Sequence, residues 1–265
     1  MIARVTVARA DVLRETSAAS LMRNVAGARI GRVWRRAKSV VLDLERNGHV
    51  VVTPRFTGAL LISAGDGGHS PETGAGPADA DSADYTCLSF MLRDGRRLRY
   101  RDVRRLGTVA WMAGSRFAAW SAALGPEPLD PALTPERFSG IVRASSRAVK
   151  TLLMDQRRLA GIGNIYANEA LWRAGIRPTR RGRAVTVAEC DRLLRALRDV
   201  LAESIALRGT SFRDYRDAFG ARGGFVERLA VYGRAGETCT RCGAVLRGHH
   251  ELEGRATVYC ATCQR

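Results

Sequence analysis

Apolar and polar residues alternate along the first half of the chain, as they do in half-buried β-strands. The alternation runs through residues 2–9, 28–45, 49–62 and 86–103. The dipeptides Asn47-Gly48 and Asp94-Gly95 interrupt it, and such pairs favour tight hairpin turns. Residues 64–84 carry few bulky side chains and many Gly, Pro, Ala and Asp, so we expect a surface loop there. The pattern predicts an all-β domain, a β-sandwich, over residues 1–123.

In the second half of the chain the apolar spacing becomes that of amphipathic helices, with apolar positions three and four residues apart. Thr134 followed by Pro135 predicts a capped helix start at the end of a Pro-rich connector. Thr186 and Glu189 predict a capping box ahead of a long amphipathic helix. The chain is therefore predicted to be α+β, with a helical domain over residues 124–228.

One segment of this helical part combines two short helices with a glycine-bracketed turn. Apolar positions over residues 150–159 and 164–174 predict the helices. Gly161 and Gly163 would let the backbone approach a bulky group closely. Asn164 heads the second helix, whose free N–H groups and dipole favour a bound phosphate. The alternative is a helical hairpin whose glycines serve only close packing, and a glycine-rich turn alone does not decide between the two.

Two C-x-x-C pairs, separated by seventeen residues, lie near the C-terminus: Cys239, Cys242, Cys260 and Cys263. Two such pairs are typical of a tetrahedral four-thiolate zinc site, and the separation leaves room for a β-hairpin. The alternative, two structural disulfides, requires an oxidising compartment, and the N-terminus lacks the apolar core of a secretion signal. We predict one structural Zn2+ in a zinc finger over residues 229–265, and buried thiols at Cys87 and Cys190.

The charge of the chain narrows the class of partner. With 43 Lys and Arg against 26 Asp and Glu, the 265 residues carry a formal net charge of +17. Such an excess implies a polyanionic partner, most simply nucleic acid. An anionic membrane surface is the alternative partner. The sequence shows neither an amphipathic basic helix with an aromatic face nor an apolar run of about eighteen residues, the two features that would favour a membrane. We expect a monomer in the cytoplasm, associated with the nucleoid.

Lysine is rare among the basic residues. Only Lys38 and Lys150 are lysines, and every other Lys-or-Arg position is arginine. Because lysine offers a compact ammonium on a flexible stem, which arginine does not, the two positions are candidates for a role that needs lysine. Chance retention in an arginine-rich composition is the alternative.

Several segments carry a family resemblance. Residues 161–178, GIGNIYANEALWRAGIRP, resemble the helix–two-turn–helix segment of the formamidopyrimidine-DNA glycosylase / endonuclease VIII family. The ending GRATVYCATCQR resembles the zinc-finger hairpin of that family, whose arginine enters the DNA at the lesion. RRAKSVVLDL resembles the segment of a DNA-contacting lysine, and DVRRLG that of a wedge arginine, with leucine for the family aromatic; in TPRF, phenylalanine replaces a family methionine. The resemblance implies DNA contacts by Lys38, Phe56, Arg104, Leu106, Gly163, Asn164 and Arg255.

The resemblance implies a base-excision repair enzyme, a DNA glycosylase and AP lyase. Such an enzyme removes oxidised purines, such as formamidopyrimidine or 8-oxoguanine, from duplex DNA containing damaged or abasic sites, and it extrudes the target base. In the family the nucleophile is an N-terminal proline beside a glutamate. The printed sequence begins at the strand that follows them, so the resemblance assigns no catalytic residue here and implies an inactive protein as written.

Two explanations of that departure are open. Either the start is misassigned, or the protein is a paralogue that binds damaged DNA without cutting it. A third hypothesis is an RNA-binding or regulatory zinc protein, which would prefer single strands. Such a preference needs a stacking platform of aromatic residues, and the sequence indicates none.

Overall fold

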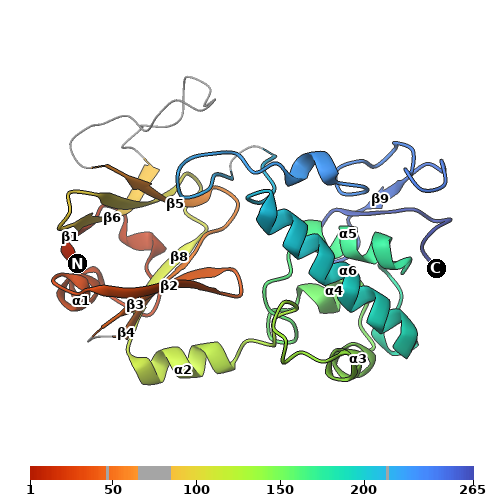
Figure 1. Cartoon of the computed structure of the whole chain (residues 1–265), viewed down its shortest axis with the longest axis horizontal. Coiled ribbons are helices and arrows are strands. Elements are labelled where there is room, and N and C mark those ends of the chain that lie inside the picture. The colour runs from red at the N-terminus through yellow and green to blue at the C-terminus, as the bar shows by residue number, and fades with distance from the viewer. Residues whose placement is uncertain (46–47, 65–84, 213–214) are drawn as a thin grey trace. The chain divides into compact units, whose positions relative to one another are not determined.

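The computed structural model describes residues 1–45, 48–64, 85–212 and 215–265, and it divides into two compact units (Figure 1). The first unit contains Met1–Ala122 and Arg208–Gly224, and the second contains Ala123–Leu207 and Phe225–Arg265. Each unit is therefore built from two stretches of the chain. Asn47 and residues 65–84 of the expected surface loop lie outside the described residues.

Two four-stranded antiparallel sheets form most of the first unit, in the strand orders β1-β6-β7-β5 and β2-β3-β4-β8 (Figure 1). Alternate residues of their strands point into a shared core, in which Leu42 and Val50 of one sheet join Leu88 and Phe90 of the other. The predicted β-sandwich is confirmed. The strands are Ile2–Val7 (β1), Ile30–Arg36 (β2), Ser39–Leu44 (β3), Gly48–Thr53 (β4), Gly58–Ser63 (β5), Thr86–Leu92 (β6), Arg97–Asp102 (β7) and Thr108–Met112 (β8).

Two helices accompany the sheets. Helix α1 (Ala18–Val25) interrupts a region for which only strands were predicted. It is short and buries only Leu21 and Val25, so its helical spacing leaves a weak pattern in the sequence. Helix α2 (Gly114–Ala122) covers the outer face of β4 and β8, where the Phe117 ring stacks on a histidine of β4.

Helices dominate the second unit, as predicted. Thr134 caps the first of them through its side-chain oxygen, and Thr186 forms a capping box with Glu189 at the start of the longest. The helices are Pro135–Arg143 (α3), Val149–Met154 (α4), Asn164–Ala174 (α5) and Val187–Ala206 (α6), and short 3-10 turns lie at Gly182–Ala184 (η3) and Phe225–Arg228 (η4), with a further one, Ala10–Val12 (η1), in the first unit.

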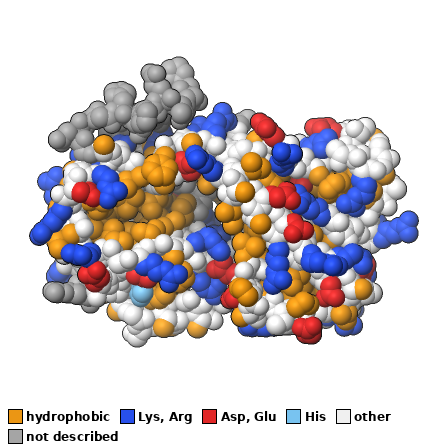
Figure 2. Space-filling view, in the orientation of Figure 1, with side chains coloured by type: hydrophobic (Ala, Val, Ile, Leu, Met, Phe, Trp, Pro, Cys, Tyr) orange, Lys and Arg blue, Asp and Glu red, His pale blue; other side chains and the backbone are white. Residues whose placement is uncertain are grey.

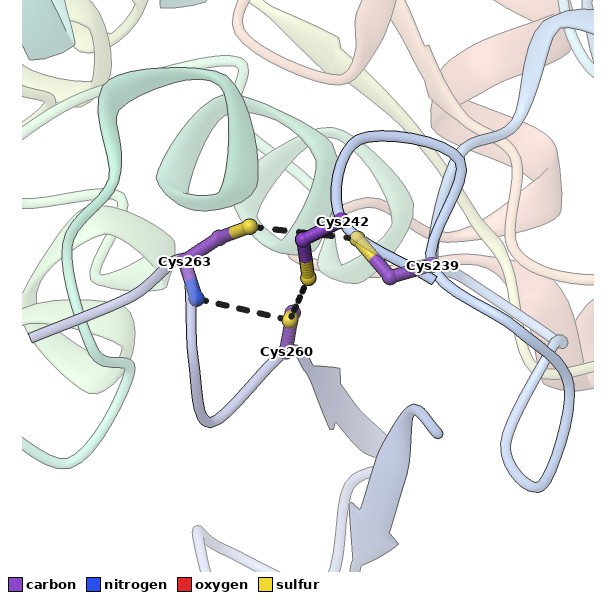
Figure 3. Close-up of side chains that lie close together, drawn as sticks. All are labelled: Cys239, Cys242, Cys260 and Cys263. Carbon is purple, nitrogen blue, oxygen red and sulfur yellow. Dashed lines mark hydrogen bonds between the residues drawn. The ribbon is translucent and has the colours of Figure 1, made fainter. Parts of the chain in front are cut away.

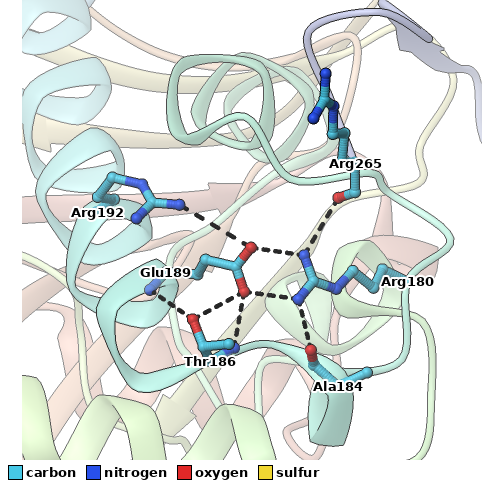
Figure 4. A network of polar contacts seen from close by, with 6 residues as sticks. All are labelled: Arg180, Ala184, Thr186, Glu189, Arg192 and Arg265. Carbon is cyan, nitrogen blue, oxygen red and sulfur yellow. Dashed lines mark hydrogen bonds and ion pairs between the residues drawn. The ribbon is translucent and has the colours of Figure 1, made fainter.

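The Glu189 carboxylate is the centre of a polar network at the start of α6 (Figure 4). It accepts two hydrogen bonds from the Arg180 guanidinium, at 2.7 and 2.6 Å, and one from the Thr186 backbone N–H at 2.8 Å. The same guanidinium donates to the Ala184 carbonyl at 2.6 Å and to the C-terminal Arg265 at 3.3 Å. These hydrogen bonds, that from Arg180 above all, lower the pKa of Glu189 to about 2.

The first helix of the glycine-bracketed pair is shorter than predicted. Helix α4 ends at Met154, whereas the prediction extended it to residue 159. Leu159 is buried in the same core as the helix, so it continues the apolar spacing although its backbone is no longer helical. A buried apolar residue in a turn is the reason that periodicity misplaced this boundary.

The C-terminal part of the second unit contains a small hairpin, in which β9 (Arg247–His249) pairs antiparallel with β10 (Thr257–Tyr259). The hairpin lies between the two C-x-x-C pairs, as predicted. Cys87 in β6 and Cys190 in α6 are fully buried thiols, also as predicted. Among the described residues, no helix combines the length and the apolar character that crossing a bilayer requires.

Candidate nucleic-acid interface and metal centre

The turn between α4 and α5 is held by a side chain that the sequence did not single out for this role. The Gln156 amide donates to the carbonyls of Met154, at 2.8 Å, and Ile162, at 3.0 Å, and its oxygen accepts the Gly161 N–H at 2.9 Å. Gly161 has a φ of 90°, a conformation that side chains other than glycine's strain to adopt. One glutamine therefore closes the turn and sets the direction in which α5 begins.

Gly163 is the N-cap of α5 and lies in ordinary extended backbone, with φ −107° and ψ 174°. A Cβ added there would have no neighbour within 4 Å. Neither backbone conformation nor internal packing therefore requires glycine at this position. The open space lies at the start of an eleven-residue helix whose first N–H groups lack intrahelical partners. This geometry suits the close approach of an anion.

The Asn164 side chain points to the C-terminal hairpin. Its amide N–H donates to the Ala256 carbonyl at 3.0 Å. Arg255, the next residue back along the chain, is exposed at the tip of that hairpin. Three of the predicted DNA-binding residues, Gly163, Asn164 and Arg255, are thus brought together in the second unit.

Two further polar residues of α5 bind the C-terminal segment and were not predicted. Asn168 accepts the Val258 N–H at 2.8 Å. The carboxylate of Glu169 accepts three backbone N–H groups at 2.8–3.0 Å, those of residues 230–232. Both side chains are fully buried, so α5 is tied to the hairpin and to the irregular segment that follows η4. Their positions on a mostly apolar helix face were the only signal in the sequence.

The four predicted ligand cysteines converge in space (Figure 3). All four Sγ atoms lie within 4.8 Å of one another, with 4.0 Å between Cys239 and Cys263 and 3.5 Å between Cys242 and Cys260. Four sulfurs bound tetrahedrally at about 2.3 Å from one zinc-sized ion lie about 3.8 Å apart. The donor set and its spacing therefore fit a metal ion, and these four thiols could bind one.

The protonation of the cluster is uneven. Burial would raise the pKa of Cys239, but backbone N–H groups of residues 241 and 242 donate to its sulfur and lower that pKa to about 6. Burial and the neighbouring thiols raise the pKa of Cys263 to about 12. Sulfurs this close cannot all be thiolates without a cation between them, because like charges repel. A bound metal ion would supply that cation.

The cysteine cluster is attached to the end of α5. Arg241 lies over the Trp172 ring, with 4.3 Å between its guanidinium carbon and the ring centroid, and donates to the Trp172 carbonyl at 3.2 Å. Gln264, fully buried, donates to the Ile176 carbonyl at 2.9 Å and accepts the Cys260 N–H at 2.9 Å. The cluster therefore fixes the hairpin against the helix that carries Asn164.

Three predicted residues of the first unit also lie together. Phe56 is 73% exposed, and the Arg104 guanidinium carbon lies 5.5 Å from the centroid of its ring. Leu106 follows in the same loop and is 41% exposed. An arginine and two large apolar side chains that are exposed together can act as a wedge between the stacked bases of a nucleic acid.

A buried carboxylate, absent from the predicted residues, holds this group in place. Asp102, which is 1% exposed, accepts the Thr57 hydroxyl at 2.6 Å and the Arg104 N–H at 3.2 Å on one oxygen. Its other oxygen accepts the Gly107 N–H at 2.8 Å and the Tyr100 hydroxyl at 3.0 Å. One side chain therefore fixes the loops of Phe56 and Arg104 relative to each other. The carboxylate raises the pKa of Tyr100 together with the larger effect of burial.

Lys38 lies at the tip of the hairpin between β2 and β3, one residue after Ala37, which has a φ of 54°. Its side chain is exposed. On the face shown in Figure 2, Lys and Arg side chains are spread over both units, and apolar side chains gather on the unit that contains the sheets. The positive charge of the chain thus extends well beyond the predicted contact residues.

Family models match most of the chain. The formamidopyrimidine-DNA glycosylase N-terminal domain matches residues 1–109, and the formamidopyrimidine-DNA glycosylase H2TH domain matches residues 124–216. The second match contains the turn between α4 and α5.

Curated relatives and solved structures agree. The chain is 41% identical over 239 residues to the formamidopyrimidine-DNA glycosylase of Xanthomonas euvesicatoria pv. vesicatoria, covering 90% of this chain and 83% of the relative. It is also 41% identical over 240 residues to the formamidopyrimidine-DNA glycosylase of Chloroflexus aggregans, covering 91% of this chain and 82% of the relative. The Fpg of Lactococcus lactis in complex with abasic-site DNA superposes with a TM-score of 0.86 at 26% identity, covering 100% of this chain and 92% of that one. MutM (Fpg) from Thermus thermophilus gives a TM-score of 0.83 at 35% identity, covering 100% and 91%.

Proposed function

The chain belongs to the formamidopyrimidine-DNA glycosylase family, and on that premise we propose that it is a base-excision repair enzyme. The activity is that of a DNA glycosylase with AP-lyase activity, which removes oxidised purines such as formamidopyrimidine or 8-oxoguanine from duplex DNA. The partner is double-stranded DNA that contains damaged or abasic sites, which agrees with the net charge of +17.

The observation that carries the proposal is the junction of Gly163, Asn164 and Arg255 in one unit. The open N-terminus of α5 binds a backbone phosphate through its N–H groups, and Asn164 adds an amide donor beside it. Arg255 contacts the DNA at the lesion. The Ala256 carbonyl that Asn164 binds is adjacent to Arg255 in the chain, so phosphate contact and lesion contact come from directly connected residues.

The group of Phe56, Arg104 and Leu106 acts where the base is extruded. Extrusion leaves a gap in the stack, and an arginine with two exposed apolar neighbours has the chemistry to fill it. Lys38, exposed at a hairpin tip, contacts the DNA backbone as a point charge. The four-cysteine cluster holds one structural Zn2+, because four protein thiolates leave no open position for a water or substrate.

Borohydride trapping on lesion-containing duplex tests the enzyme. A lyase of this type attacks the sugar C1′ with an amine, and the imine that forms is reduced by borohydride to a stable covalent adduct. The nucleophile implied by the resemblance is an N-terminal proline, and the printed chain starts with Met1. The experiment is therefore run with this chain and with a form extended by the codons upstream of Met1.

An adduct with the extended form is the expected result, because that form can supply the N-terminal proline that the resemblance implies. If neither form leaves an adduct while both bind abasic duplex, the catalytic proposal is wrong and the protein is a binding module for damaged DNA. If neither binds duplex DNA at low ionic strength, both proposals are wrong.

A further inference from the structure

Lys150 is a buried cation that the DNA-contact residues do not account for. It lies in α4 and is fully buried, and its ammonium donates to the Ala256 carbonyl and to the Thr257 hydroxyl, each at 2.7 Å. Both acceptors are neutral, and no carboxylate forms an ion pair with Lys150 among the described residues. Burial, and then the charge of Arg255, lower the pKa of Lys150 to about 8. Burying a lone ammonium is costly, so stability alone is a poor reason for this residue.

The acceptors of Lys150 show what it holds. The Ala256 carbonyl also accepts the Asn164 amide at 3.0 Å and lies 3.4 Å from that of Asn168. Donors from α4 and α5, on either side of the turn, therefore converge on one backbone oxygen. The Thr257 hydroxyl donates onward to the Arg255 carbonyl at 3.1 Å. The backbone immediately following Arg255 is thus fixed from two helices.

Arginine does not fit this role. An ammonium reaches two acceptors that lie side by side in a closed site, whereas a planar guanidinium needs more room and five partners. The chain carries 43 Lys and Arg residues, and lysine occurs at only two of those positions. One of them is exposed at a hairpin tip, and the other is this buried site.

We propose that Lys150 is a positioning residue for Arg255: its ammonium fixes residues 255–257 against the helix–two-turn–helix, so that Arg255 and Asn164 meet DNA as one preassembled surface. The proposal rests on the proposed function for its DNA readout. Its structural part, that Lys150 holds the hairpin tip, can be measured without DNA.

The first readout is amide hydrogen exchange of residues 250–258 in the free protein. Lys150→Met keeps the apolar stem and removes the charge, and we expect faster exchange of this segment by about tenfold, the factor for losing one or two buried hydrogen bonds. Thr257→Val removes one of the two acceptors of Lys150 together with the hydrogen bond to the Arg255 carbonyl, and it should speed exchange of the same segment. It also serves if Lys150→Met fails to fold. Metal content of one ion per chain confirms that the finger itself is intact.

The second readout is a double-mutant cycle on the preference for abasic over intact duplex. Lys150→Met should reduce that preference about tenfold in the wild type and hardly at all in an Arg255→Ala background, because a residue that acts through Arg255 has nothing to position once it is gone. Lys150→Arg, which keeps the charge but not the shape of the ammonium, should also show a reduced preference for abasic duplex. Arg137→Met, which removes one exposed positive charge from α3, is the matched control and should leave the preference unchanged.

Unchanged hydrogen exchange in both variants would overturn the proposal, and so would equal losses from Lys150→Met in the two backgrounds. A wild-type protein without preference for abasic duplex would instead refute the proposed function. In that case the exchange measurement still decides whether Lys150 holds the hairpin tip.

Discussion

Gly163 is a residue at which the needs of the fold and of the ligand can be separated. Its backbone conformation is open to any residue, and an added Cβ meets no protein atom within 4 Å. Gly163→Ala should therefore lower the free energy of unfolding by no more than about 1 kcal/mol, the usual effect of alanine at an N-cap. A methyl group in the path of a phosphate should lower duplex affinity about tenfold or more. Urea denaturation and binding to intact and abasic duplexes measure the two effects.

The matched control for that substitution is Gly140→Ala in α3, where an added Cβ also meets nothing. It should stabilise the helix by up to about 1 kcal/mol and leave DNA affinity unchanged. Equal affinity of Gly163→Ala and wild type for every duplex would mean that no phosphate approaches this turn.

Single residues of the candidate site differ in how well their roles can be predicted from the sequence. Cys239 and its three partners follow a fixed spacing, because metal ligands must lie close together on a short stretch of chain. Gln156, Asp102 and Lys150 act through backbone groups that are distant in sequence or hidden in a turn, and no local spacing reports such partners. The rarity of lysine was the sole hint at one of them.

Among the elements, α6 offers the clearest dependence on pH. Folding lowers the pKa of Glu189 from 4.5 to about 2, chiefly through the hydrogen bonds from Arg180 (Figure 4). The stabilisation is fully present above pH 4.5 and is lost as the pH falls through that value towards 2, since the unfolded chain then binds the proton first. With the side chain 17% exposed, a shift of this size contributes roughly 3 kcal/mol at neutral pH.

Glu189→Gln should remove that contribution while keeping the shape of the capping box. We expect the variant to be less stable than the wild type at pH 7 and the difference to shrink by about half or more near pH 3. Urea denaturation of both proteins from pH 7 to pH 3 measures it, and any loss of metal in acid affects both alike. A difference that stays constant with pH would show that the carboxylate is not ionised more easily in the folded protein.

Helices and strands could be predicted from the sequence where the periodic apolar pattern extended over many residues or where a polar capping residue marked the start of a helix. The alternation of the sandwich strands, Thr134 before α3 and the Thr186–Glu189 box before α6 all correspond to observed elements. The exceptions were short helices. Helix α1 buries only two apolar residues, and the apolar spacing of α4 continues beyond the helix into a turn in which Leu159 is buried. Tertiary packing, which one sequence does not display, decides such boundaries.

On the scale of the whole molecule, two kinds of DNA contact act together. The net charge of +17 attracts any duplex and gives an affinity that falls steeply with salt. In the proposed function, a small number of positioned residues adds preference for a lesion, and those proposed in the second unit depend on the finger. The apolar cluster of the finger has only five buried members, Val231, Cys239, Leu246, Val258 and Cys260, and two of them are metal-ligand candidates.

Removal of the metal should therefore separate the two kinds of contact. The large apolar clusters of the sandwich and of the helices contain none of the four cysteines, so a chelator should unfold the finger and leave most β and helical circular dichroism in place. Affinity for intact duplex should remain salt-dependent, because most of the basic residues lie outside the finger. Preference for abasic duplex should disappear and return when Zn2+ is added back. If the chelated protein keeps that preference, Arg255 and its hairpin do not recognise the lesion, and the preference must come from residues outside the finger.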